Sequence, residues 1–111
     1  MTGIPEVTVV SEDGTARLVL TGEIDVSIAP AVVSHAEQLL AGRPRAVVVD
    51  LTAVTFLDSA GIGALVALNN AAGEAGVPTV QLVPGPPNVM RVLQIVGLTG
   101  VFDVVGEPGH R

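Results

Sequence analysis

The residues best suited to chemistry in this chain are a neighbouring carboxylate and hydroxyl, Asp58 and Ser59. An apolar run precedes the pair and another follows it, which predicts a buried strand that turns into a helix at this point. Asp58 suits the N-cap position, because its carboxylate can accept hydrogen bonds from the free backbone N–H groups of the first turn. Ser59 would then open the helix with its hydroxyl pointing outward, where another protein can reach and modify it.

The pair also has a purely structural interpretation, because aspartate and serine are favoured at helix starts whatever the function. Local sequence alone favours that interpretation. Helical spacing places Ser59 on one face with Ile62, Gly63 and Val66. Ile62 and Val66 could form an apolar contact for a partner beside the serine. The alternative that Ile62 packs under a neighbouring loop is equally compatible with the spacing.

Enzymatic interpretations find little support in the residue pattern. The motif around Ser59 lacks the preceding glycine of a nucleophile elbow, and the histidines are His35, inside a predicted helix, and His110 near the end. The glycines after the serine lie inside a helix and do not match a dinucleotide-binding loop. Asp25 and Asp58 could form a carboxylate pair, but nothing marks a substrate pocket. We therefore expect a protein that is not an enzyme and binds no cofactor or metal.

Composition excludes several further classes of function. The chain has no cysteine, which removes disulfides and thiolate metal sites. Its formal charge is −6, with no lysine and five scattered arginines, so a nucleic-acid partner is not expected. No apolar run approaches the roughly 20 residues that span a bilayer, and the first residues do not resemble a signal peptide. We expect a single cytoplasmic domain over residues 1–111 that does not insert into a membrane.

Hydrophobic periodicity and turn residues divide the chain into strands and helices. Strands are predicted at residues 7–10, 16–21, 46–51, 78–83 and 101–105. Helices are predicted from about Ser27 to Gly42, from Ser59 to about Glu74, and at residues 89–96 with Asn88 as the cap. The first two strands form an antiparallel hairpin. Strand and helix then alternate, which predicts an α/β fold with parallel strands, its helices on one face or both.

The loop after the second strand contains a further acidic residue, Asp25. Because the ends of parallel strands collect their loops on one side of a sheet, we expect Asp25 to lie on the same edge as Ser59. Its simplest role is structural: either Asp25 or Ser27 is expected to cap the first helix.

The chain resembles the STAS domain of bacterial anti-sigma factor antagonists. The resemblance rests on Asp50-Leu51 and on residues 56–65, Phe-Leu-Asp-Ser-Ala-Gly-Ile-Gly-Ala-Leu, and is supported by residues 18–25 with Ala29-Pro30 and by residues 89–98. It covers almost the whole chain. It implies a mixed β-sheet opened by an antiparallel hairpin, followed by β-α units whose main helices pack against one face. Family members often carry a further C-terminal helix, for which residues 106–111 leave no room.

The resemblance also implies a function in transcription regulation and stress response. An unphosphorylated antagonist binds a kinase-type anti-sigma factor and releases a sigma factor. That anti-sigma factor, an ATP-dependent serine kinase, would phosphorylate Ser59, with ATP bound by the partner, and a serine phosphatase would reverse the modification. The residues implied in partner binding are Asp25, Asp58, Ser59, Ile62, Gly63 and Val66.

Two questions stay open at the level of sequence. Many relatives carry basic residues late in the second helix, where this chain has Asn69, Asn70 and Glu74, so the identity of the kinase does not follow from the resemblance. A STAS domain can also be a scaffold subunit of a membrane transporter complex, with no phosphorylation cycle.

Overall fold

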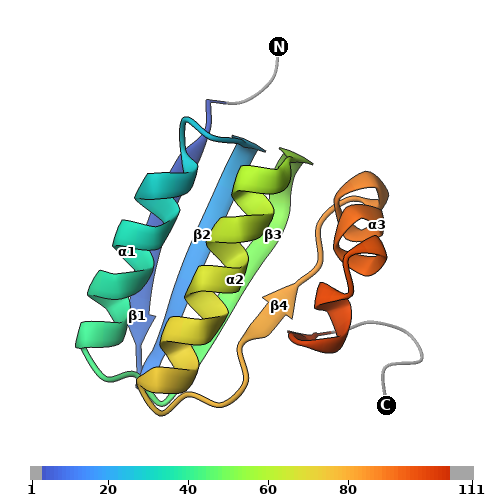
Figure 1. Cartoon of the computed structure of the whole chain (residues 1–111). Coiled ribbons are helices and arrows are strands. Elements are labelled where there is room, and N and C mark those ends of the chain that lie inside the picture. The colour runs from blue at the N-terminus through green and yellow to red at the C-terminus, as the bar shows by residue number, and fades with distance from the viewer. Residues whose placement is uncertain (1–3, 106–111) are drawn as a thin grey trace.

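A computed structural model describes residues 4–105 of the chain (Figure 1). The expectation about a C-terminal helix concerns residues 106–111 and lies outside this range. The five strands form one sheet in the order β1-β2-β3-β4-β5. Strands β1 (Glu6–Glu12) and β2 (Thr15–Ile24) are antiparallel, whereas β2, β3 (Ala46–Leu57), β4 (Gln81–Val83) and β5 (Asp103–Val104) pair in parallel. The predicted α/β fold with a mixed sheet is confirmed.

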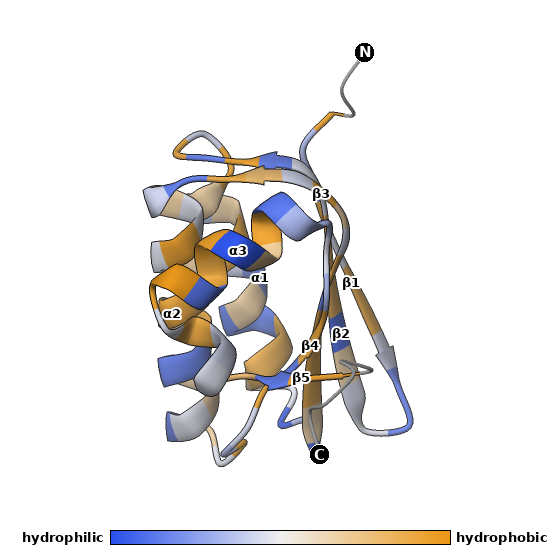
Figure 2. Cartoon of the chain, turned by 90° about the vertical axis from the view of Figure 1, so that its right-hand side faces the viewer, coloured by the Kyte–Doolittle hydropathy of each residue, from blue (hydrophilic) through white to orange (hydrophobic). Residues whose placement is uncertain are grey.

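The helices form a second layer on one side of the sheet. Helices α1 (Ala29–Ala41) and α2 (Ser59–Glu74) lie side by side over β1 to β3, and α3 (Pro87–Ile95) lies beyond β4, followed by the short 3-10 helix η1 (Leu98–Gly100) (Figure 1). Figure 2 shows this layer beside the strands, with no helix of residues 4–105 on the opposite face. Of the two arrangements that the spacing allowed, the one-sided arrangement implied by the STAS resemblance is correct.

The core lies between the sheet and the helices, and the spacing of the buried residues matches strands and helices that each have one covered face. Strand β2 buries alternate residues on the helix side, as expected for a strand with one covered face. Helix α2 buries residues at the spacing of one helical face. The largest fully buried side chains include Leu18, Leu20, Ile24, Leu51, Leu65 and Leu68. None of the helices described is long and apolar enough to cross a membrane.

Strand β3 is longer than the sequence predicted. It ends at Leu57, whereas the continuous β-branched run that predicted it ends at Leu51. The pairing with β2 shifts register between Val19 and Thr21 and again further along, so apolar and polar residues do not alternate regularly in the second half. The added length matters for function, because β3 runs up to the residue before Asp58. Strands β4 and β5 are shorter than predicted.

Two predicted helix caps are wrong. Helix α1 has Ile28 at the N-cap position and no side-chain cap, because the Asp25 carboxylate instead accepts hydrogen bonds from the backbone N–H and hydroxyl of Ser27. Helix α3 has Pro86 at the N-cap position. The Asn88 side chain lies one residue inside the helix and donates to the carbonyl oxygen of Thr55 at 3.0 Å. Proline suits a helix start since it has no N–H to satisfy.

Candidate functional site

The start of helix α2 has the predicted geometry. Asp58 is the N-cap, with extended backbone, and its Oδ1 accepts from the backbone N–H groups of Ala60 at 2.9 Å and Gly61 at 3.0 Å. These are two of the donors that a helix start otherwise leaves without partners. Ser59 is the first helical residue and is exposed. The Asp58 cap therefore orders the first turn of α2, from which the Ser59 side chain is exposed to solvent.

The ends of β2 and β3 bring the predicted residues to one edge of the sheet. Ile24 pairs with Leu57, and the backbone N–H of Asp58 donates to the carbonyl oxygen of Ile24 at 3.4 Å. Asp25 and Asp58 each follow one member of that pair. The expectation that the Asp25 loop shares an edge with Ser59 is confirmed.

The two glycines of the first turns of α2 have different surroundings. A β-carbon on Gly61 would lie 2.5 Å from the carbonyl oxygen of Ile24 and 2.7 Å from Cδ1 of Leu57. A side chain there would collide with backbone, so the close approach of helix and strand requires glycine. A β-carbon on Gly63 would meet nothing within 4 Å. Nothing among the described residues requires glycine at that position.

The outward face of α2 carries most of the residues that the sequence placed beside Ser59. Gly63 is exposed and Val66 retains 37% of its surface. Ile62 is half-buried and packs against the core cluster. The geometry thus favours the packing role of Ile62 over a fully exposed contact, and the accessible stripe consists of Ser59, Gly63 and Val66.

Sequence reasoning missed an apolar groove beside the serine, which we call the α1–α2 groove. It has a volume of about 270 Å³ and lies between the first turns of the two helices. Its lining is Val26, Ala29, Pro30, Val33, Ala60, Gly63 and Ala64. The available signal was an apolar residue, Val26, in a loop between polar neighbours, together with small residues on both helices. The packing of α1 against α2, which forms the groove, is a tertiary feature.

The electrostatics of this edge are acidic. Hydrogen bonds from the hydroxyl and backbone N–H of Ser27 hold the pKa of Asp25 below its ordinary value of 3.8, so Asp25 is ionised at neutral pH. Residues 18–42 and 46–90 contain neither arginine nor lysine. No group of three acidic, histidine or cysteine residues able to hold a metal ion occurs within residues 4–105.

Asp50 lies on the sheet face that the helices leave open, away from the serine. Its Oδ2 is 3.4 Å from Nη1 of Arg17 on the neighbouring strand, and its Oδ1 accepts from the backbone N–H of Thr52 at 2.9 Å. Burial tends to raise the pKa of Asp50, but the hydrogen bonds from Thr52 and the charge of Arg17 outweigh it and the net shift is downward. Asp50 therefore has a structural role, as a hydrogen-bonded residue of β3.

Comparisons with known proteins fit this geometry. The family model described as Mlab, STAS domain, matches residues 7–106. The anti-sigma-F factor antagonist RsfB of Mycobacterium tuberculosis is 39% identical over 69 residues, which are 62% of this chain and 57% of that protein. The chain thus matches less than two thirds of the length of this curated relative.

Solved structures match over more of the chain. A crystal structure of an anti-sigma factor antagonist from Mycobacterium paratuberculosis has a TM-score of 0.84 at 28% identity, covering 96% of this chain and 92% of the other. The Bacillus cell fate determinant SpoIIAA in its phosphorylated form has a TM-score of 0.64 at 16% identity, covering 95% of each chain, and supports the fold alone. With a family model matched across nearly all the described residues, this chain belongs to the STAS domain family.

Proposed function

We propose that this STAS domain is an anti-sigma factor antagonist. In its unphosphorylated form it binds a kinase-type anti-sigma factor in the cytoplasm and so frees a sigma factor. The names of the sequence relative and of the structural neighbour support the proposal. The observation that carries it is the Asp58 cap, which places Ser59 exposed at the first position of α2.

Phosphorylation of Ser59 is the proposed off-switch. The partner transfers the γ-phosphoryl group of its bound ATP to the Ser59 hydroxyl oxygen, which loses its proton, and ADP leaves. The phosphate adds about −1.5 to −2 charges at neutral pH. The N–H groups of Ala60 and Gly61 are already bonded to Asp58, and no arginine or lysine lies in this part of the sequence. The new charge therefore faces the partner. A serine phosphatase restores the binding form.

The proposed binding surface follows from exposure. Ser59, Gly63 and Val66 form its accessible stripe on α2, and Asp25 extends it to the neighbouring loop. Asp58 positions Ser59 and adds a negative charge, while Ile62 supports the stripe from the core side. The chain acts by binding and being modified, and ATP belongs to the partner.

A second candidate function is a scaffold subunit of a membrane transporter complex without a phosphorylation cycle. The description of the matched family model, Mlab, STAS domain, does not name an antagonist, so the family match is compatible with this second function as well. The two functions differ in whether Ser59 is modified.

Phosphate mapping distinguishes the two candidates. The chain is incubated with ATP and each purified kinase-type anti-sigma factor of the same organism, and the product is mapped by mass spectrometry. We expect one phosphate on Ser59 and none on Ser11, Ser27 or Ser34, and a Ser59→Ala variant stays unmodified. A phosphate mapping mainly to another residue would refute the assignment. An unmodified chain that copurifies with transport subunits would support the scaffold.

A further inference from the structure

We propose that the α1–α2 groove is the pocket into which the anti-sigma factor inserts one apolar side chain flanked by basic residues. The inference rests on the proposed function, because it identifies a second contact for the same partner. It goes beyond the phosphorylation site, since none of the α1 residues that line the groove takes part in the modification.

The groove is open and apolar. Its walls are small or branched apolar residues, and at Gly63 an added β-carbon would meet nothing within 4 Å. At its rim Val26 keeps 72% of its surface in water, although it lies between two polar residues of the loop. A volume of about 270 Å³ accommodates a leucine, methionine or phenylalanine side chain. Filling the groove would remove apolar surface from water, which favours binding.

The groove is continuous with the modified serine. Ala60 and Gly63 line it and belong to the same first turns of α2 that begin at Ser59. The opposite wall of the groove is the start of α1, and the loop that contains Asp25 leads directly into that helix. A kinase that places its ATP over the Ser59 hydroxyl therefore covers the mouth of the groove.

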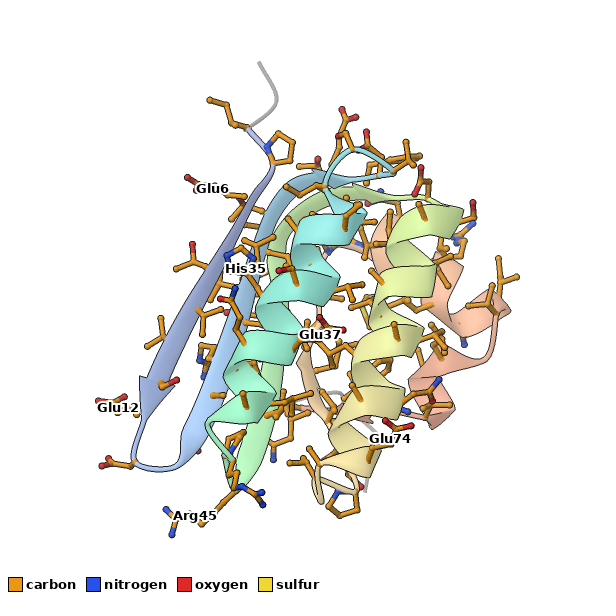
Figure 3. All side chains as sticks on the ribbon, turned by 60° about the vertical axis from the view of Figure 1, so that its left-hand side comes forward. Glu6, Glu12, His35, Glu37, Arg45 and Glu74 are labelled. Carbon is orange, nitrogen blue, oxygen red and sulfur yellow. The ribbon has the colours of Figure 1, made fainter. Side chains whose placement is uncertain are left out.

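The acidic residues around the groove indicate which residues of the partner should flank the inserted apolar side chain. Glu23 at the end of β2, Asp25 in the loop after it and the N-cap Asp58 lie at this edge, and Glu37 projects from α1 on the side of α2 (Figure 3). Neither helix carries an arginine or a lysine. Figure 3 shows Arg45 at the other end of the molecule. An apolar residue flanked by arginine or lysine is complementary to this rim, whereas a second copy of the chain would bring like charges together.

The two exposed glycines of α2 provide a matched test. Gly63→Leu places a side chain in the groove, and Gly73→Leu makes the same change ten residues later on the same helix, where a β-carbon also meets nothing within 4 Å. Both changes replace a helical glycine, so neither should lower the melting temperature. Binding to the kinase-type anti-sigma factor that phosphorylates Ser59 is measured by calorimetric titration with Mg-ADP, which permits no phosphoryl transfer. We expect Gly63→Leu to weaken binding at least tenfold and Gly73→Leu to change it less than twofold.

A second pair of variants consists of one that removes apolar surface from the groove without filling it, and one control outside the groove. Val26→Ser should weaken binding several-fold, whereas Val10→Ser, at a residue of β1 that is 46% exposed, should not.

Three outcomes would count against the proposal or its basis. If wild type binds and both Gly63→Leu and Val26→Ser bind as tightly as wild type, the groove proposal is overturned and the proposed function stands. If no such kinase binds wild type, the proposed function itself fails. If Gly63→Leu instead converts a dimer to a monomer in light scattering, a second copy occupies the groove, which also overturns the proposal.

Discussion

Gly61 and Ile24 are in contact across the junction of helix and sheet: a β-carbon on Gly61 would lie 2.5 Å from the carbonyl oxygen of Ile24. The first turn of α2 therefore lies directly against the end of β2. This contact, together with the hydrogen bond from Asp58 to the same carbonyl group, fixes Ser59 at the edge of the sheet. The position of the serine thus depends on a residue that has no side chain.

Replacing Gly61 by alanine should destabilise the fold, although alanine is the better helix former. The added methyl group collides with backbone, and overpacking of this kind costs about 1–3 kcal/mol. Gly63→Ala is the control, because its β-carbon is unobstructed, and it should leave stability unchanged or raise it by up to about 1 kcal/mol. Urea unfolding of the two variants measures the difference. Equal stabilities would show that the helix can move away from β2 at little cost.

Two substitutions of Asp58 should distinguish its structural role as a cap from a functional role in phosphorylation. Asp58→Ala removes the cap and should cost about 1 kcal/mol, whereas Asp58→Asn should keep most of that stability, since asparagine caps nearly as well. If the carboxylate also orients the Ser59 hydroxyl for the kinase, Asp58→Asn should be phosphorylated more slowly despite a nearly unchanged melting temperature. A wild-type phosphorylation rate for Asp58→Asn would leave Asp58 as a cap only.

Ser59 itself should be structurally neutral. Its side chain is exposed and takes no part in the cap, so Ser59→Ala should change the free energy of unfolding by no more than about 0.5 kcal/mol. The variant should still bind the partner, and ATP should no longer release it. Thermal unfolding and pull-down with and without ATP test both statements. A large loss of stability would show that the hydroxyl has a structural partner.

Asp50 should make stability depend on pH in the acid range. The pKa of its carboxyl is lowered in the folded protein, so its contribution is fully present above the unfolded value, near 3.8, and is lost as the pH falls through the folded value. Asp50→Asn cannot titrate. The stability difference between wild type and Asp50→Asn should therefore shrink as the pH falls from 6 to below 3, as measured by urea unfolding. A difference independent of pH would contradict the role assigned to the Arg17 and Thr52 contacts.

Local pattern was sufficient for the elements that position the site. The β-branched run before Leu51, the Asp58 cap and the apolar face of α2 predicted a strand followed by a capped helix, and the structure contains both. Those signals are local, because a buried strand and a capped helix are each encoded within a few residues. The end of β3 was missed, since register shifts against β2 remove the alternation that marks a strand.

Features that depend on packing between elements were not predictable in the same way. Residue type alone predicts Asp25 or Ser27 as one helix cap and Asn88 as another. In the structure Asp25 and Ser27 instead bond to each other, and Asn88 donates to the carbonyl oxygen of Thr55. The α1–α2 groove requires the distance between two helices, which no short segment specifies. The open space around Gly63 likewise depends on the positions of residues in other elements.

The most direct test of the proposed switch is a calorimetric titration of one kinase-type anti-sigma factor with two forms of the chain, unmodified and phosphorylated on Ser59. The added charge, about −1.5 to −2, falls beside the Asp58 carboxylate, within residues 46–90 that contain no arginine or lysine, so the phosphorylated form should bind at least tenfold more weakly. Ser59→Asp, with one charge, should lie between the two forms. Equal affinities of the unmodified and phosphorylated chains would contradict the account.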